Sequence, residues 1–274
     1  MHRTFLHRRQ RARRGGGARF HPLQRRAGRG AARRSFQRSH LARAPGGRDR
    51  VHELKLRAGP EVSQAVKVAW VFDVISPFSY LAFPRLVELP PHVQLECVPV
   101  LLAGLLKHFG QAGPAEIPSK RRFTYRFVIW RARSMGIPMR MPPAHPFNPL
   151  SALRLIIAAG GDRRAAGTVL DAVFRDGRDV SDPAVIADLA LLLGVTNPQA
   201  AIADPAVKER LRANTDWAIS RGIFGVPTLV IGEELFWGHD AVDMALEYLN
   251  RPEAFADPEM RAADVLPVGV TRER

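Results

Sequence analysis

An apolar run of strand length, VAWVFDV at residues 68–74, is the first regular feature along the chain. It is rich in β-branched and aromatic residues and stops at Ser76-Pro77, as a buried strand does. Residues 79–88 then have the apolar spacing of a short helix, which Pro90-Pro91 ends. Residues 94–100 alternate polar and apolar positions, as in a second strand. The sequence therefore predicts a β-α-β unit, whose strands should be parallel and joined by a right-handed crossover.

A long helical block follows this unit. Apolar residues recur at roughly helical spacing in six segments, near residues 101–109, 120–135, 151–159, 167–174, 183–193 and 206–220. Breakers such as Gly113-Pro114 and Asn197-Pro198 separate them. Strand character then returns at residues 226–231 and 235–237, which a tight turn joins.

The C-terminal part predicts one further helix and a loose end. We expect Asp240 to cap a helix that runs through Leu249, and the polar tail from Pro252 to be loose. The element order predicts an α/β, thioredoxin-like fold, with a small mixed sheet and a large all-helical insertion between the β-α-β and β-β-α halves. The expected domains are an N-terminal segment at 1–65, a thioredoxin-like domain at 66–103 and 216–252, a helical insertion at 104–215 and a C-terminal tail at 253–274.

The net charge of +15 belongs to one segment. Residues 1–50 hold 16 Arg and a single acidic residue, Asp49, so the rest of the chain has 25 basic and 25 acidic residues. We expect this Arg-rich segment to be disordered, because it has too few aliphatic residues to offset the entropy of ordering. It resembles a nucleic-acid-binding arm, a transit peptide, or upstream sequence translated from too early a start. We favour the last, since Arg outnumbers Lys 36 to 5, and we do not expect a nucleic-acid partner.

The composition excludes several classes of protein. No apolar run approaches the ~18 residues that span a bilayer, so no membrane association is expected, and we predict a cytoplasmic protein. The single cysteine, Cys97, excludes a disulfide framework, a CxxC redox pair and a cysteine-rich zinc site. The histidines are too scattered to predict a metal site. We expect Trp70, Trp130 and Trp237 to be packing residues, and Asn148 to cap the following helix.

Ser76-Pro77-Phe78-Ser79 lies where the first strand meets the first helix. Unpaired N–H groups at a helix N-terminus stabilise negative charge, and redox thioredoxins place a CxxC motif there, where the thiol pKa is lowered. Here both ends of that spacing are serine, so the protein alone cannot exchange disulfides. One interpretation is that a serine hydroxyl donates a hydrogen bond to the thiolate of a ligand. The other is that both serines only cap the helix.

Two further segments are candidates for ligand contacts. Pro227 opens the third strand, where a proline cannot donate to the ladder, and the Val226–Pro227 bond is a candidate for the cis isomer. A cis bond would present the Val226 backbone to an extended, peptide-like ligand; the alternative is an ordinary proline at a strand entry. Asp240 could accept a ligand ammonium group, or serve only as a helix cap.

Five stretches together resemble the 2-hydroxychromene-2-carboxylate isomerase family, which is related to kappa-class glutathione transferases and DsbA-type oxidoreductases. They are FDVISPFSYLAFPRL, LLAGLLKHFG, IPSKRRF, HPFNPLSALR and GVPTLVIGEELFWGHDAVDMALEYL. The resemblance spans roughly residues 66–250. It implies a thioredoxin domain interrupted by a helical insertion, which agrees with the element order.

The resemblance also implies glutathione as cofactor. Ser76 matches the family serine that activates the glutathione sulfur, and Val226, before the cis Pro227, matches the residue whose backbone pairs with the cysteinyl unit. Asp240 matches the aspartate that binds the γ-glutamyl ammonium group, and Lys120 the lysine that contacts the glycine carboxylate.

Three positions depart from the family pattern. Gln111 stands where asparagine is common, His239 where serine, asparagine or glutamine is usual, and Ala241 where an arginine often follows the aspartate. The implied activity interconverts 2-hydroxychromene-2-carboxylate-type and trans-o-hydroxybenzylidenepyruvate-type aromatic compounds, in a homodimer. The alternatives are a kappa-like glutathione transferase and a non-catalytic DsbA-like binding protein.

Overall fold

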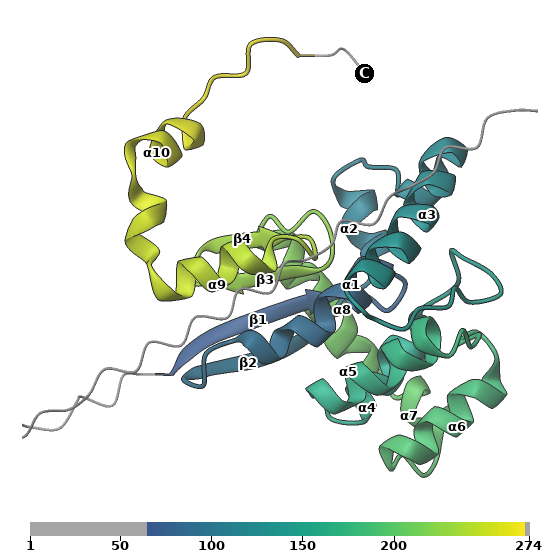
Figure 1. Cartoon of the computed structure of the whole chain (residues 1–274). Helices are drawn as coiled ribbons and strands as arrows, with labels where there is room; N and C mark the ends of the chain where they lie inside the picture. The colour runs from purple at the N-terminus through teal and green to yellow at the C-terminus, as the bar shows by residue number, and fades with distance from the viewer. Residues whose placement is uncertain (1–64, 272–274) are drawn as a thin grey trace, which may run out of the picture. The chain divides into compact units, whose positions relative to one another are not determined.

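A four-stranded mixed sheet carries the fold of the described part, residues 65–271, of this computed structural model. The strands are β1 (Val66–Phe72), β2 (Val93–Pro99), β3 (Thr228–Ile231) and β4 (Glu234–Trp237). Their order is β2-β1-β3-β4, with β1 parallel to β2 and antiparallel to β3, and β3 antiparallel to β4 (Figure 1). This sheet confirms both the parallel β-α-β unit and the closing β-hairpin. The predictions for residues 1–64 and 272–274 lie outside the described residues.

Helices separate and follow the strands as the α/β fold class predicts. Between β1 and β2 lie α1 (Pro77–Ala82) and the 3₁₀-helix η1 (Phe83–Glu88). Between β2 and β3 lie α2 (Leu102–His108), η2 (Pro114–Glu116), α3 (Pro118–Ser134), α4 (Leu150–Ala158), α5 (Arg163–Leu170), the π-helical turn η3 (Asp171–Arg175), α6 (Pro183–Leu193), α7 (Pro198–Ala203) and α8 (Pro205–Ser220). After β4 come α9 (Val242–Asn250), η4 (Pro252–Ala256) and α10 (Pro258–Asp264). The insertion in the sheet is therefore helical, while the domain limits stay a prediction.

Three of these helices correct the sequence analysis. The expectation of a loose tail from Pro252 was wrong for residues 252–264, where η4 and α10 lie, and α7 begins at a dipeptide that had been interpreted only as a breaker. The physical reason is the same for α7 and α10. Asn197 and Asp257 accept backbone N–H groups of the first helical turn, and a proline follows each of them at the position where no N–H is needed.

The core lies on both faces of the sheet. Trp70 and Phe72 point to one face, stack with ring centroids 4.2 Å apart and pack among side chains of α4, α5 and α9. Val71 and Val98 point to the other face, where they pack with Leu105 of α2 and with α8. Because β1 is buried on both faces, its residues form the near-continuous apolar run seen in the sequence.

Of the three tryptophans expected to be packing residues, only Trp70 lies in the core, although the Trp237 ring packs on Phe224 with centroids 4.9 Å apart. Trp70 is fully buried, but Trp130 is 60% exposed and Trp237 is 54% exposed. Trp237 lies in β4, the edge strand, at a position that alternation turns away from buried Phe236. Trp130 lies on α3 among residues that are not packed against the main core.

Within the described range, no helix is long and apolar enough to cross a bilayer.

Candidate active site

Ser76 lies at the start of α1, directly after β1. It is the N-cap residue, and its Oγ accepts a hydrogen bond from the Ser79 N–H at 3.3 Å. The same Oγ donates to the carbonyl oxygen of Val226 at 3.4 Å, across 150 positions of sequence. Ser76 is only 5% exposed. Ser76 therefore caps the helix, as one of the two interpretations of this serine predicted. It also contacts the backbone of Val226, in the segment before β3.

Ser79 behaves differently. It is fully buried, and its Oγ has no hydrogen-bond partner in the described part of the chain. The interpretation of both serines as caps was therefore wrong for Ser79, whose backbone N–H, and not its hydroxyl, takes part in the cap.

Val226 and Pro227 lie beside Ser76. The Val226–Pro227 peptide bond is cis, as the sequence suggested. Both ladders of β3 begin at Thr228, so the Val226 backbone lies outside the sheet pairing. The carbonyl oxygen of Pro227 accepts the Gly238 N–H at 2.9 Å, which brings the loop after β4 to the same place.

Asp240 lies in this loop and does not cap α9, contrary to the prediction. The helix begins at Val242, and Ala241 occupies the cap position without a side-chain hydrogen bond. The Gly238 backbone has a φ of 108°, and a Cβ there would lie 2.5 Å from Asp240 Oδ1, so this turn suits only glycine. The Asp240 side chain is 76% exposed and lies 3.8 Å from the ring of His239. Its carboxylate is therefore accessible to a ligand.

His239 is buried beneath Asp240. Its ring stacks on Phe78 with centroids 5.3 Å apart, and its Nε2 accepts a hydrogen bond from Arg131 Nε at 3.3 Å. Because Nε2 is an acceptor, the proton of the neutral ring belongs on Nδ1. Burial lowers the pKa of His239, with Arg131 acting in the same direction and Asp240 against it. The buried ring packs under the loop after β4, which carries Asp240. A contact between His239 and glutathione stays a prediction.

Two predicted site residues are not joined to this group. Lys120, in the first turn of α3, and Gln111, just after α2, are both exposed. Within the described residues, no hydrogen bond or ion pair links either side chain to Ser76, Val226 or Asp240. Asn148 accepts the backbone N–H of Leu150, the first residue of α4, at 3.1 Å, although the N-cap position itself is taken by Pro149.

A row of aromatic side chains that reaches Phe78, two residues after Ser76, was missed by sequence reasoning. Phe123, Phe127 and Trp130 of α3 lie at centroid distances of 5.9 Å from one to the next, and Phe127 lies 6.2 Å from Phe78. Phe123 is 68% exposed. The spacing of four and three residues places them on one side of the helix, which the sequence could have shown. We call these four residues the aromatic row.

Asp73, three residues before Ser76, was also missed. It is fully buried, and its two carboxyl oxygens accept the N–H groups of Ile75 at 3.0 Å and Leu102 at 2.8 Å. Burial raises the pKa of Asp73 from 3.8 to about 7, although both hydrogen bonds oppose the rise. The folded chain thus holds this proton more tightly than the unfolded chain does.

We expect this proton to make stability depend on pH. The contribution of Asp73 is fully present below about pH 4 and is lost as the pH rises through about 7. Between about pH 5 and pH 8, the wild-type chain should lose roughly 1–3 kcal/mol of unfolding free energy relative to Asp73→Asn, whose amide does not titrate. Urea unfolding at both pH values measures the difference, and parallel losses in the two proteins would contradict it.

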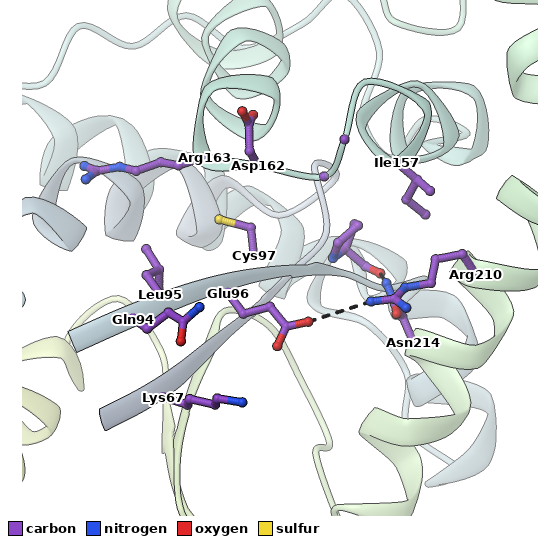
Figure 2. Close-up of a pocket in the computed structure, with 13 residues that line it drawn as sticks. Lys67, Gln94, Leu95, Glu96, Cys97, Ile157, Asp162, Arg163, Arg210 and Asn214 are labelled. Carbon is purple, nitrogen blue, oxygen red and sulfur yellow. Dashed lines mark hydrogen bonds and ion pairs between the residues drawn. The ribbon is translucent and has the colours of Figure 1, made fainter. Parts of the chain in front are cut away.

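A cavity of about 540 Å³ lies elsewhere, along the outer edge of β2 (Figure 2). Figure 2 shows Cys97 and Glu96 on this strand, with Glu96 3.7 Å from Arg210 of α8. Burial raises the pKa of the Cys97 thiol to about 11, so the thiol stays protonated at neutral pH. In the described ranges, no three His, Cys, Asp or Glu side chains gather as a metal site would require. None of Ser76, Val226, Pro227 and Asp240 lines this cavity.

A mixed sheet in this order, a serine-flanked helix start after β1 and a cis-proline facing it define a thioredoxin-fold protein. Residues 67–250 match the family model described as DSBA-like thioredoxin domain, and the chain belongs to this family. The match confirms the predicted fold class.

The relatives are enzymes of two kinds. 2-Hydroxychromene-2-carboxylate isomerase of Pseudomonas putida is 29% identical over 196 residues, which cover 67% of this chain and 94% of that protein. Glutathione S-transferase kappa 2 of Caenorhabditis elegans is 26% identical over 210 residues, covering 68% and 92%. A solved structure of 2-hydroxychromene-2-carboxylate isomerase superposes with a TM-score of 0.60 at 27% identity, covering 70% of this chain and 99% of that one. The family resemblance inferred from the motifs is confirmed.

Proposed function

We propose that this protein is a glutathione-dependent isomerase of the 2-hydroxychromene-2-carboxylate isomerase type, in which Ser76 stabilises the glutathione thiolate. The observation that carries the proposal is the meeting of Ser76 Oγ with the Val226 backbone next to the cis Pro227. An extended peptide that pairs with Val226 would bring a cysteinyl side chain to the serine. The similarity to the Pseudomonas putida isomerase supports the choice of reaction.

The hydroxyl of Ser76 is available for this role. Its present bond to the Val226 carbonyl is 3.4 Å long, whereas O–H···O bonds in proteins are most often about 2.7–2.8 Å. A bond this long is weak, so the hydroxyl can turn to a sulfur atom at small cost. Its neighbours at the start of α1 are backbone N–H groups, which also favour a thiolate.

The aromatic row supports an aromatic substrate. In the proposed reaction, the glutathione thiolate adds to the carbon–carbon double bond of an unsaturated pyruvate, and the electron pair moves to the conjugated carbonyl as an enolate. The former double bond rotates, the enolate collapses and the thiolate leaves, so glutathione is regenerated. The exposed ring of Trp130 and the partly buried ring of Phe78 offer flat surfaces for the substrate ring.

A kappa-like transferase is the second candidate, because the Caenorhabditis elegans relative matches over nearly its whole length. The two reactions share the thiolate and differ in whether the conjugate is released. The test is an absorbance assay of hydroxychromene-carboxylate interconversion, with and without glutathione. We expect interconversion only with glutathione and no loss of free thiol. Stoichiometric loss of thiol would identify a transferase, and conversion independent of glutathione would overturn both.

Asp240→Asn is expected to weaken glutathione binding roughly tenfold to a hundredfold. The asparagine keeps the shape but loses the charge that pairs with the γ-glutamyl ammonium group, and a charge-assisted hydrogen bond is worth about 1.5–3 kcal/mol. Since Asp240 does not cap α9, the melting temperature should stay unchanged. Calorimetric titration measures the affinity.

Asp243→Asn is the matched control for this change. Asp243 is equally exposed and lies three residues further on, but it forms an ion pair with Arg85. It should leave glutathione affinity within about twofold of the wild type. Equal affinity of all three proteins would remove Asp240 from the binding site.

A further inference from the structure

The residue before Ser76 is held on both sides of its backbone. The N–H of Ile75 donates to Asp73 Oδ1 at 3.0 Å, and the carbonyl oxygen of Ile75 lies 2.7 Å from His145 Nε2. The N–H of Ser76 itself donates to the Asp73 carbonyl oxygen at 3.0 Å. The chain that enters Ser76 is therefore fixed by three hydrogen bonds before the helix begins.

The groups that hold Ile75 are themselves tied to the helical insertion. His145 lies in the loop between α3 and α4, and its Nδ1 is 2.8 Å from the hydroxyl of Tyr125 on α3. The second carboxyl oxygen of Asp73 accepts the N–H of Leu102, the first residue of α2. The position of Ser76 at the start of α1 thus depends on parts of the helical insertion, which follows β2.

The hydrogen positions in this network follow from the partners. A carbonyl oxygen only accepts, so His145 Nε2 must carry the proton that reaches Ile75. Burial lowers the pKa of His145, although its hydrogen bond to Ile75 acts in the opposite direction. The Tyr125 hydroxyl donates its one proton to the His145 carbonyl oxygen at 2.7 Å, and its oxygen lies 2.8 Å from Nδ1. Tyr125 therefore contacts both the backbone and the ring of His145 and orients the ring with Nε2 toward Ile75.

We propose that His145 is a positioning residue for Ser76, oriented by Tyr125. The proposal rests on the proposed function, in which the Ser76 hydroxyl turns from the Val226 carbonyl to the glutathione sulfur. Without the His145 bond, the Ile75–Ser76 peptide unit is held only by the Ser76 N–H bond to Asp73, and the direction of the serine hydroxyl is less tightly fixed. Misplacing a reacting group by about 1 Å can cost as much as ~10²-fold in rate.

His145→Ala is expected to lower kcat about tenfold while the dissociation constant of glutathione changes less than about twofold. His145→Ala should also raise the pKa of the bound glutathione thiol, which is measured from the thiolate absorbance as a function of pH. His145→Gln is the conservative variant, because its amide nitrogen takes the place of Nε2 and can donate to Ile75; it should recover most of kcat. Tyr125→Phe removes only the hydroxyl and should give an intermediate loss. His92→Ala, at an exposed histidine, is the control without effect.

A measurement on the ligand-free protein separates this proposal from the proposed function. Backbone amide exchange of Ser76 and Ser79 should be faster in His145→Ala and Tyr125→Phe than in the wild type, and slower again in His145→Gln. If the wild type binds no glutathione but exchange follows this order, the proposed function fails and the positioning role stands. If exchange, kcat and thiol pKa are the same in the wild type and Tyr125→Phe, and His145→Gln behaves like His145→Ala, His145 has no positioning role.

Discussion

Replacing Ser76 with alanine is expected to lower isomerase turnover near neutral pH by up to ~10²–10³-fold, the cost of losing one donor to a developed negative charge. This is an upper limit, because sulfur is larger and softer than the oxyanion for which the figure holds. The proposed tripeptide contacts through Val226 and Asp240 do not involve the Ser76 hydroxyl, so glutathione affinity should change little. Raising the pH should recover part of the rate, since bulk ionisation then supplies the missing thiolate.

The measurement is the thiolate absorbance of the enzyme–glutathione complex, titrated against pH in parallel with turnover. Ser76→Ala also removes the cap of α1, which is worth about 1 kcal/mol of stability, so assays belong well below the melting temperature. Ser79→Ala is the matched control, because it deletes a buried hydroxyl that has no partner in the described part of the chain. It should leave the chemistry unchanged and the stability equal or slightly higher.

The outcome identifies the serine. An effect of Ser79→Ala with none of Ser76→Ala would mean that the wrong serine was assigned to the sulfur. No effect of either would leave Ser76 with its capping role alone.

Trp70→Ala is expected to cost about 3–5 kcal/mol of unfolding free energy, the largest stability effect that we predict. The indole is fully buried on β1, stacks on Phe72 and lies 5.6 Å from the ring of Phe83. Alanine would leave a cavity bounded by rigid rings and a strand, where the surroundings cannot collapse easily. Urea denaturation with a two-state fit measures the loss.

Two tryptophan variants complete this test. Trp130→Ala removes the same side chain from a position that is 60% exposed, and it should cost less than about 1 kcal/mol. Trp70→Phe keeps an aromatic ring and removes the indole N–H, which has no partner in the described part of the chain, so it should cost far less than alanine. Equal losses in Trp70→Ala and Trp130→Ala would contradict the burial argument.

The same two tryptophans show what a sequence can and cannot predict. Trp70 belongs to a continuous apolar run, and such a run has no polar face on which to place the ring, so its burial followed from the pattern. Trp130 belongs to a helix whose other residues are mixed, and whether that side of α3 meets another element is set by the rest of the chain. The sequence pattern predicted a helix but not the surface against which it packs.

Local chemistry settled several features without the tertiary structure. The Ser76 cap and the proline that enters β3 each depend on neighbours within a few residues, and both were predicted from the sequence. The order of elements was also sufficient for the fold class, because a parallel β-α-β unit followed by a hairpin leaves few ways to form one sheet. The caps at Asn197 and Asp257 were equally local and could have been predicted.

Long-range contacts decided the rest. Whether Asp240 caps α9 depended on the Gly238 turn, which is held by the Pro227 carbonyl. The bond between Asp73 and Leu102 joins residues 29 positions apart, and the bond between His145 and Ile75 joins residues 70 positions apart. A hydrogen bond between distant residues leaves no periodic trace in the sequence, because either partner alone is an ordinary polar side chain. The sequence by itself determined which residues are neighbours of Ser76 along the chain. Only the packing of the helical insertion against the sheet decided that the distant His145 reaches Ile75. Bringing such distant segments together costs chain entropy, and this cost is offset by burial of the whole core and not by the local residues.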